Sequence, residues 1–306
     1  MKRPIADFLN NEPSYEPAHP MSSTAMNREI NVFCDGLDHP EGLAFASDGT
    51  LYCGGEAGQI YRITPDGKSH EIVGDTGGFN LGLVFSPEGW LAICDGRKNC
   101  IWRFNLSNAS LEVWASESGG KVLGGMNFPV FDTKGNLYAS ENGRWGEREG
   151  IVHRFQPNGK GEAWARDFHF ANGLALDVAE SFLYVVQSSK NDVLRVPILS
   201  DGRAGGSEAF VSGLTHVPDG LAFDAEGSLY VCCYGDNSIW KVNARGDKEL
   251  VVNDPTSLLL NRATNVAFGG PRGQTLFVAN LGGYQLSALE LSVRGQALAG
   301  GEMWSV

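Results

Sequence analysis

The sequence has few of the features that would commit it to sulfur chemistry, a membrane or a nucleic acid. Its six cysteines include no Cys-x-x-Cys pair, the spacing typical of sulfur metal sites. No apolar run approaches the roughly 20 residues of a membrane-spanning helix. Lysine and arginine (24) are outnumbered by aspartate and glutamate (36), for a formal charge of −12. This excess repels phosphate backbones and anionic membranes and attracts cations, so we expect no nucleic-acid or membrane partner.

Signatures of secretion and of serine hydrolases are also absent. The N-terminus starts with a basic residue pair, but no apolar run of signal-peptide length follows, which predicts a cytoplasmic protein. The cysteines fall inside apolar strand-like runs, as buried reduced thiols do. No Gly-x-Ser-x-Gly elbow occurs and the six histidines show no pairing signal, so a serine triad is poorly supported.

A motif recurs along the chain with a period near 45 residues. The copy VPDGLAFDAEGSLYVCCYGDNSIWKV starts at residue 217, and equivalent copies start at residues 39, 80, 126, 171 and 263. Each copy contains a short apolar strand, a turn rich in Asp, Gly and Pro, a second strand, a polar loop and a third strand. An alternating segment such as EAFVSG supplies a fourth strand. Six such units bury their faces only by stacking radially.

The repeat therefore predicts an all-β fold, a six-bladed β-propeller with four antiparallel strands per blade and a central channel. The segment EINVFCDGL, residues 29–37, precedes the first copy and is expected to close the ring by pairing with the last blade. We expect one propeller domain over residues 29–306, with residues 1–28 forming a tail or a strap across the surface.

Aligning the copies predicts a ring of side chains at the mouth of the channel, because the first strand of each propeller blade is innermost. Four positions before the apolar anchor of each first strand lie the ring residues: Glu41, Leu81, Asn127, Asn172, Asp219 and Thr264. Any single Asx-Gly pair among them could be only a turn former. Together, two carboxylates and two amides without sulfur or imidazole suit Ca²⁺ first, with Mg²⁺, Mn²⁺ or Zn²⁺ as alternatives.

The ends of the second strands return to the same face in an antiparallel hairpin and supply a second set of candidate pocket residues. This set comprises Glu56, Asp95, Glu141, Gln187, Tyr234 and Asn280. The alternative for each is an ordinary solvated loop side chain. Apolar side chains near the mouth are Phe79, Leu81, Met126, Phe128, Trp145 and Phe170, which fit either an apolar pocket or packing.

The segments HPEGLAF, NGLALD and VPDGLAFDAEGSLYV, with TNVAFGGPRGQTLFVAN near the end, resemble the gluconolactonase, regucalcin (senescence marker protein) and luciferin-regenerating enzyme family. The resemblance spans roughly residues 30–295. It implies a six-bladed propeller with one divalent metal in its channel, held by Glu41, Asn172 and Asp219. Asn127 would be a further ligand or a substrate contact, and Asp219 the catalytic base.

Two departures from the sugar-lactone members of that family weaken the case for a sugar-acid lactone as substrate. Those members have an arginine two residues before the third-blade asparagine and an acid directly after it, whereas this chain has Gly125 and Phe128. The substrate-binding residues we expect are Asn127, Phe128, Glu141, Trp145 and Gln187.

The function that follows is metal-assisted hydrolysis of a small-molecule lactone, with water activated by the metal and Asp219 as general base. A phosphotriesterase-like or strictosidine-synthase-like enzyme on the same scaffold is one alternative, because fold does not fix chemistry. A non-enzymatic binding propeller with a structural cation is another. The sequence leaves the oligomeric state open.

Overall fold

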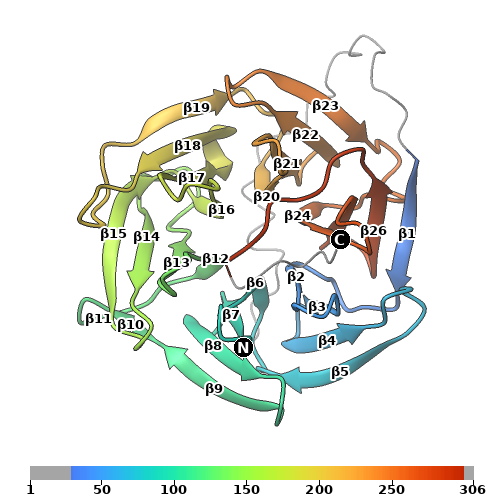
Figure 1. Ribbon diagram of the computed structural model, residues 1–306, viewed down its shortest axis with the longest axis horizontal. Helices are drawn as coiled ribbons and strands as arrows, with labels where there is room; N and C mark the ends of the chain where they lie inside the picture. The colour runs from blue at the N-terminus through green and yellow to red at the C-terminus, as the bar shows by residue number, and fades with distance from the viewer. Residues whose placement is uncertain (1–28, 300–306) are drawn as a thin grey trace.

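Six four-stranded antiparallel sheets are arranged radially around a central axis in the computed structural model, which describes residues 29–299 (Figure 1). The strands are, in chain order, β1 (Ile30–Asp35), β2 (Leu43–Phe45), β3 (Leu51–Gly54), β4 (Gln59–Ile63), β5 (His70–Asp75), β6 (Asn80–Phe85), β7 (Leu91–Asp95), β8 (Cys100–Asn105), β9 (Ser110–Ala115), β10 (Glu117–Ser118), β11 (Lys121–Val122), β12 (Met126–Phe131), β13 (Leu137–Glu141), β14 (Gly150–Phe155), β15 (Gly161–Phe168), β16 (Ala171–Leu176), β17 (Phe182–Gln187), β18 (Asp192–Pro197), β19 (Glu208–Ser212), β20 (Pro218–Phe223), β21 (Leu229–Cys233), β22 (Ser238–Val242), β23 (Lys248–Asn253), β24 (Ala263–Gly269), β25 (Thr275–Asn280) and β26 (Gln285–Glu290). The six-bladed propeller predicted from the repeat is confirmed.

Blades one to five each use four consecutive long strands, from β2–β5 to β20–β23, whereas the sixth blade has the order β24-β25-β26-β1. Its outer strand comes from the start of the described chain, with Ile30 opposite Leu289 and Asp35 opposite Gln285. The expected closure of the ring is therefore confirmed. Strands from the two ends of the repeat share one sheet, so the hydrogen bonds of that sheet keep the ring closed. The predicted tail, residues 1–28, lies outside the described residues.

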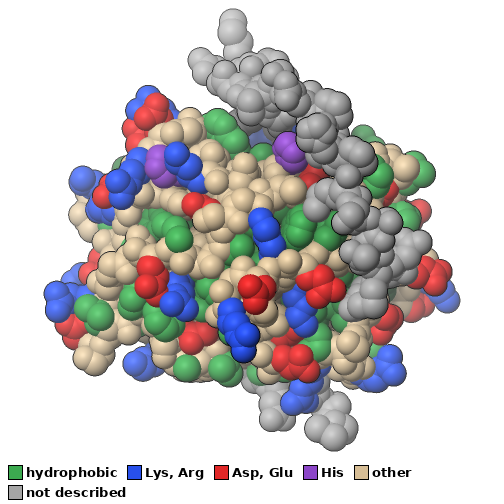
Figure 2. All heavy atoms as spheres, turned by 90° about the horizontal axis from the view of Figure 1, so that it is seen from above, with side chains coloured by type: hydrophobic (Ala, Val, Ile, Leu, Met, Phe, Trp, Pro, Cys, Tyr) green, Lys and Arg blue, Asp and Glu red, His purple; other side chains and the backbone are tan. Residues whose placement is uncertain are grey.

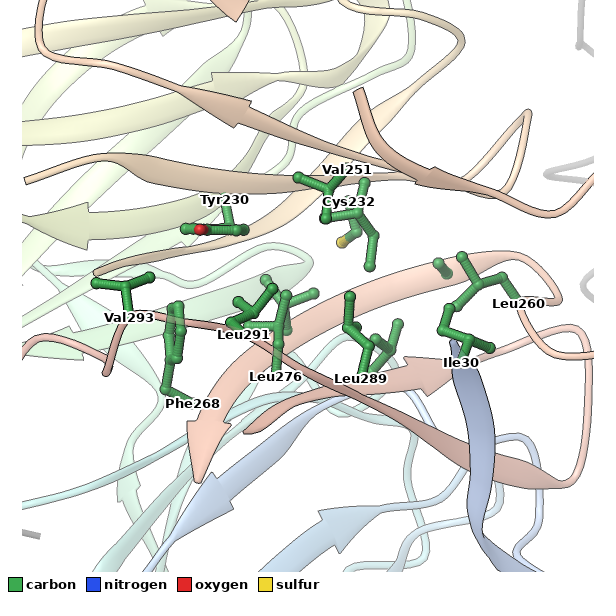
Figure 3. Close-up of a cluster of buried hydrophobic side chains, with 14 residues drawn as sticks. Ile30, Tyr230, Cys232, Val251, Leu260, Phe268, Leu276, Leu289, Leu291 and Val293 are labelled. Atoms are coloured by element: carbon green, nitrogen blue, oxygen red, sulfur yellow. The ribbon is translucent and has the colours of Figure 1, made fainter. Parts of the chain in front are cut away.

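Apolar side chains hold neighbouring blades together face to face. Figure 3 shows the cluster between the fifth and sixth blades, where Tyr230 and Cys232 of β21 face Phe268 and Leu276. Cys233, the next residue of β21, packs into the cluster on the other side of the same sheet, against the fourth blade. All six cysteines are buried and free, which confirms the reduced thiols expected from their apolar surroundings.

The outer wall of the propeller is polar and of mixed charge. Acidic and basic side chains lie close together on the face in Figure 2, and ion pairs such as Arg62–Glu71 and Arg195–Glu208 join the third and fourth strands of their blades. Exposed pairs of this kind contribute at most about 1 kcal/mol. Within residues 29–299 no helix is long and apolar enough to cross a membrane, and the single helical element named there is the 3-10 turn η1 (Ser188–Lys190).

The channel end opposite the ring residues contains an apolar cavity of about 410 Å³. Side chains at or next to the ends of the inner strands line it: Phe45, Phe85, Phe131, Leu176, Phe223 and Phe268. The segment 295–299 runs along this end, where Gln296 donates its backbone N–H to Phe223 O and its side-chain Nε2 to Leu176 O, at 2.9 and 3.0 Å. The C-terminal segment thus ties the fourth, fifth and sixth blades together and lines the cavity.

The inner strands β2, β6, β12, β16, β20 and β24 contact one another in a closed circle. Glycines after four of the ring residues allow this close approach. A Cβ atom placed on Gly173 would lie 2.3 Å from Asp219 O, and one on Gly220 would lie 2.6 Å from Thr264 O. Neither obstacle is a flexible side chain, so a larger residue could be accepted only by moving a neighbouring blade.

We predict that Gly173→Ala lowers the free energy of unfolding by about 1–3 kcal/mol or more, as overpacked cores do. Gly206→Ala is the matched control, because no heavy atom lies within 4 Å of its added Cβ, and it should leave stability unchanged or raise it by about 0.4–1 kcal/mol. Urea unfolding of both variants measures the difference. Equal stability of Gly173→Ala and wild type would show that the strands are not in the tight contact described.

Candidate functional site

Five of the six ring residues sit at irregular points of the inner strands, and Glu41 lies two residues before β2. In blades two to six the pairing of the first and second strands shifts register around the ring residue, between Asn80 and Leu83, Met126 and Pro129, Ala171 and Leu174, Pro218 and Leu221, and Ala263 and Asn265. β-Bulges interrupt the ladder and re-aim a side chain. The bulges therefore explain how residues of an otherwise regular strand can turn toward the channel.

Buried oxygen atoms without a partner are concentrated at this ring. All six ring residues are buried. Glu41 Oε2, Asn127 Oδ1 and Asn172 Oδ1 are enclosed and accept no hydrogen bond within the described part of the chain. Buried polar atoms in native proteins are nearly always hydrogen-bonded, and an unsatisfied one costs about 1–3 kcal/mol. Three such oxygens in one ring indicate a binding site, in which a bound ion, water or ligand would supply the missing partner.

The two carboxylates of the ring are held in an unfavourable electrostatic environment. Burial raises the pKa of Asp219 to about 8, although a hydrogen bond from Asn172 offsets part of the effect. Burial, followed by repulsion from Asp219, raises the pKa of Glu41 well above its ordinary range. No ion pair found among residues 29–299 involves either group. A cation between them would remove both penalties.

The chemistry of this donor set fits a hard divalent cation. No group of three or more His, Cys, Asp and Glu side chains arranged to hold a metal occurs among the described residues. A cation here would therefore depend on the amide oxygens of Asn127 and Asn172 as well as on Glu41 and Asp219. An all-oxygen set of this kind suits Ca²⁺, Mg²⁺ or Mn²⁺.

Hydrogen bonds connect Asn127 and Asn172 of the ring to the next blade. Asn142 Oδ1 accepts from Asn127 Nδ2 at 3.4 Å, and Asn142 Nδ2 donates to Ala171 O at 2.8 Å. Ser188 Oγ accepts from Asn172 Nδ2 at 3.1 Å and donates to Pro218 O at 2.7 Å. Neither Asn142 nor Ser188 was predicted from the sequence, although each directly follows a member of the predicted second set, Glu141 or Gln187.

Four members of that second set use their side chains inside their own blades. Glu141 Oε2 accepts the backbone N–H of Gly124 at 2.9 Å and lies 3.0 Å from His153 Nε2. Gln187 Oε1 accepts the N–H of His169, and Gln187 Nε2 donates to Asp192, both at 2.8 Å. These bonds account for Glu141 and Gln187 without a substrate, and their role in substrate binding stays a prediction.

Asp95 and Asn280 are clearer cases of the same arrangement. Both are fully buried; Asp95 accepts the backbone N–H of Phe79 at 3.0 Å, and Asn280 accepts that of Asn261 at 2.9 Å. Each therefore fixes the loop that leads into an inner strand. The expectation that they line a pocket is wrong, because the side chain at this point of the second strand turns into its own blade.

The expected apolar contacts divide between the two ends of the channel. Trp145 is partly exposed and packs edge to face on Phe170, with ring centroids 5.0 Å apart. Phe170 lies two residues before the ring residue Asn172, so this pair belongs to the ring end. Phe128 is buried and lines the apolar cavity at the other end. Met126 is fully buried in the cluster between blades two and three and belongs to the packing.

Comparison with known proteins agrees with this architecture. A family model described as SMP-30/Gluconolactonase/LRE-like region matches residues 112–281, and one described as Strictosidine synthase-like, N-terminal, matches residues 34–63. The Lactonase drp35 of Staphylococcus saprophyticus is 24% identical over 295 residues, which cover 90% of each chain.

Two solved structures share the fold. A gluconolactonase from Xanthomonas campestris superposes with a TM-score of 0.75 at 21% identity, over 90% of this chain and 93% of that one. Regucalcin from Agrobacterium tumefaciens, described as a calcium-binding protein, gives a TM-score of 0.72 at 18% identity, over 89% and 96%. With more than half of its length matched by the first family model, the chain belongs to the SMP-30/gluconolactonase/LRE-like family.

Proposed function

We propose that this protein is a divalent-metal-dependent hydrolase that opens the ring of a small lactone. The observation that carries the proposal is the ring of buried oxygens, three of which have no partner among the described residues. Membership of a family with lactonase and gluconolactonase relatives supports the reaction class. Regucalcin, a calcium-binding relative in fold, supports Ca²⁺ as the first candidate ion.

Glu41, Asn127, Asn172 and Asp219 would hold the ion, which when bound would polarise the lactone carbonyl and lower the pKa of a water molecule. Four protein ligands are fewer than the six to eight oxygens that Ca²⁺ takes, so water and substrate would complete the shell. This shortage supports a catalytic site over a structural cation, whose ligands would be supplied mainly by the protein.

Asp219 is the residue that we assign as general base. The Asn172 side chain lowers the pKa of the Asp219 carboxyl and so offsets part of the effect of burial. The burial of Asp219 excludes bulk water as a competing proton donor. Asp219 would accept a proton from the attacking water and return it to the leaving alkoxide of the opened ring, so that no covalent intermediate is needed. Trp145 and Phe170 pack against each other, and Phe170 precedes the ring residue Asn172 by two positions in the sequence. These two aromatic side chains would contact the body of the lactone.

We expect hydrolysis of aldonolactones or of alkyl and aromatic lactones to stop after chelation and to return when Ca²⁺, Mg²⁺, Mn²⁺ or Zn²⁺ is added to wild type. Asp219→Asn should lower kcat/KM by about 10²–10⁴-fold, the usual contribution of a general base. Initial rates of hydrolysis of these lactones measure the effect of chelation and the effect of Asp219→Asn. Glu249→Gln, a change at an exposed residue of β23, is the control and should retain full activity.

Turnover that resists chelation would instead favour chemistry of the strictosidine-synthase type, whose family model matches the segment containing Glu41. Full metal loading without turnover of any lactone would favour a binding propeller with a structural cation. Turnover unaffected by Asp219→Asn would exclude Asp219 as the base.

The raised pKa of Asp219 gives a second test, by stability. The folded-state pKa of about 8 exceeds the ordinary value of 3.8, so folding favours the protonated carboxyl. That contribution is complete below about pH 4 and is lost as the pH rises through about 8. In chelated protein, Asp219→Asn should therefore raise the Tm at pH 8, and the gain should vanish toward pH 4.

Thermal unfolding in chelator at several pH values, repeated with Ca²⁺, measures this difference. Calcium should raise the Tm of wild type at pH 8 much more than that of Asp219→Asn, while Glu249→Gln should follow wild type throughout. A lower Tm for Asp219→Asn at pH 8 in chelator would contradict the electrostatic strain described for the ring.

A further inference from the structure

Two of the four proposed ligands are amides, and an amide can present either end to a cation. The carboxamide of asparagine has an oxygen acceptor on one side and an NH₂ donor of nearly the same size on the other. A half-turn of the side chain would point two N–H groups at the ion in place of a lone pair. The protein must therefore fix the orientation of Asn127 and Asn172 for the ring to bind a metal.

Asn142 fixes the orientation of Asn127 through a chain of directed hydrogen bonds. The backbone carbonyl of Ala171 can only accept, so the group of Asn142 that faces it at 2.8 Å must be the NH₂ group. The oxygen of Asn142 then faces Asn127 and can bond only to its NH₂ group, 3.4 Å away. Asn127 Oδ1 is left on the opposite side, buried and without a partner among the described residues.

Ser188 does the same for Asn172. Its hydroxyl has one hydrogen, which it donates to Pro218 O at 2.7 Å, again a group that can only accept. The hydroxyl oxygen therefore accepts from Asn172 Nδ2 at 3.1 Å. Asn172 Oδ1 is likewise left buried and unpartnered in the described part of the molecule. Two different side chains thus produce the same result in neighbouring blades.

The two carbonyl anchors lie at equivalent points of the fold. Ala171 directly precedes the ring residue Asn172, and Pro218 directly precedes the ring residue Asp219. Each connection therefore runs from the ligand of one blade to the backbone beside the ligand of the next. A displacement of either blade would break the bond that orients the amide.

We propose that Asn142 and Ser188 are positioning residues that set the metal affinity of the ring by holding the carboxamide oxygens of Asn127 and Asn172 toward the ion. This inference rests on the proposed function, because it assumes that the ring binds a cation. It adds two residues that would touch neither metal nor substrate. Outer partners that orient metal ligands typically change affinity by about 10–100-fold when they are removed.

The test is calorimetric titration of chelator-treated protein with Ca²⁺ alone. Ser188→Ala and Asn142→Leu should each weaken Ca²⁺ binding by about 10–100-fold, and Ser188→Thr, which keeps the hydroxyl, should bind more tightly than Ser188→Ala. Ser238→Ala is the matched control: Ser238 is an equally buried serine that bonds to Asp236, Thr215 and Trp240 rather than to a ring residue. It should bind Ca²⁺ like wild type. Thermal unfolding in chelator checks that each variant is folded.

A double-mutant cycle separates positioning from general packing. If Asn142 acts through the amide of Asn127, then Asn142→Leu should lose its effect on Ca²⁺ affinity in an Asn127→Ala background, so that the two changes are not additive. Additive losses would overturn the proposal, because Asn142 would then act by another route. Should Ser188→Ala fail to fold, this cycle still decides.

The outcomes distinguish this inference from the proposed function. Wild-type affinity in both Ser188→Ala and Asn142→Leu, with binding lost in Glu41→Gln, would overturn the positioning role and leave the metal site intact. Absence of Ca²⁺ binding by wild type itself would overturn both.

Discussion

The contact between neighbouring inner strands is the constraint on which the rest of this structure depends. At Gly173 and Gly220 the backbone lies against the carbonyl of the ring residue in the following blade, with no room for a side chain. Between the sixth and first blades, the hydroxyl of Thr264 donates to Glu41 O at 2.9 Å. Six blades held at this spacing bring ring residues from distant parts of the chain into one small volume. Looser packing would leave each of them as an isolated turn residue.

The same close packing lowers the stability of the folded protein, because it buries two carboxyl groups near each other. Glu41 and Asp219 are removed from water, and repulsion by Asp219 further raises the pKa of Glu41. The apolar clusters between the blades offset this cost, since burial contributes roughly 25 cal/mol for each Å² of apolar surface removed from water. Electrostatic strain concentrated in one buried ring is typical of a functional site.

Much of the fold could be predicted from the sequence because its determinants are local and repeated. Alternating apolar residues and turns rich in Asp and Gly define each strand within a few positions, and six copies give six blades. Closure by residues 29–37 could be inferred because the last blade otherwise lacks a fourth strand. The same alignment indicated Glu41 and Asp219 as members of one ring, and both are buried there. Their metal ligation remains a proposal.

The parts that could not be predicted depend on side-chain direction at strand ends and on contacts across the molecule. Alternation along β13 and β17 turns Glu141 and Gln187 into their own blades, where they fix the loops that lead to the inner strands. The next residue in each case, Asn142 or Ser188, lies beyond the strand and reaches the ring. Choosing between the last residue of the second strand and the residue after it would require an alignment of the six repeat copies that is accurate to one residue. The copies differ in the length of the loop between their second and third strands, which starts at this point. The carbonyls that orient these side chains belong to another blade, so no local pattern in the sequence identifies them. The residues of the ring follow from the repeat, whereas the groups that we propose to orient them become visible only when the blades are assembled.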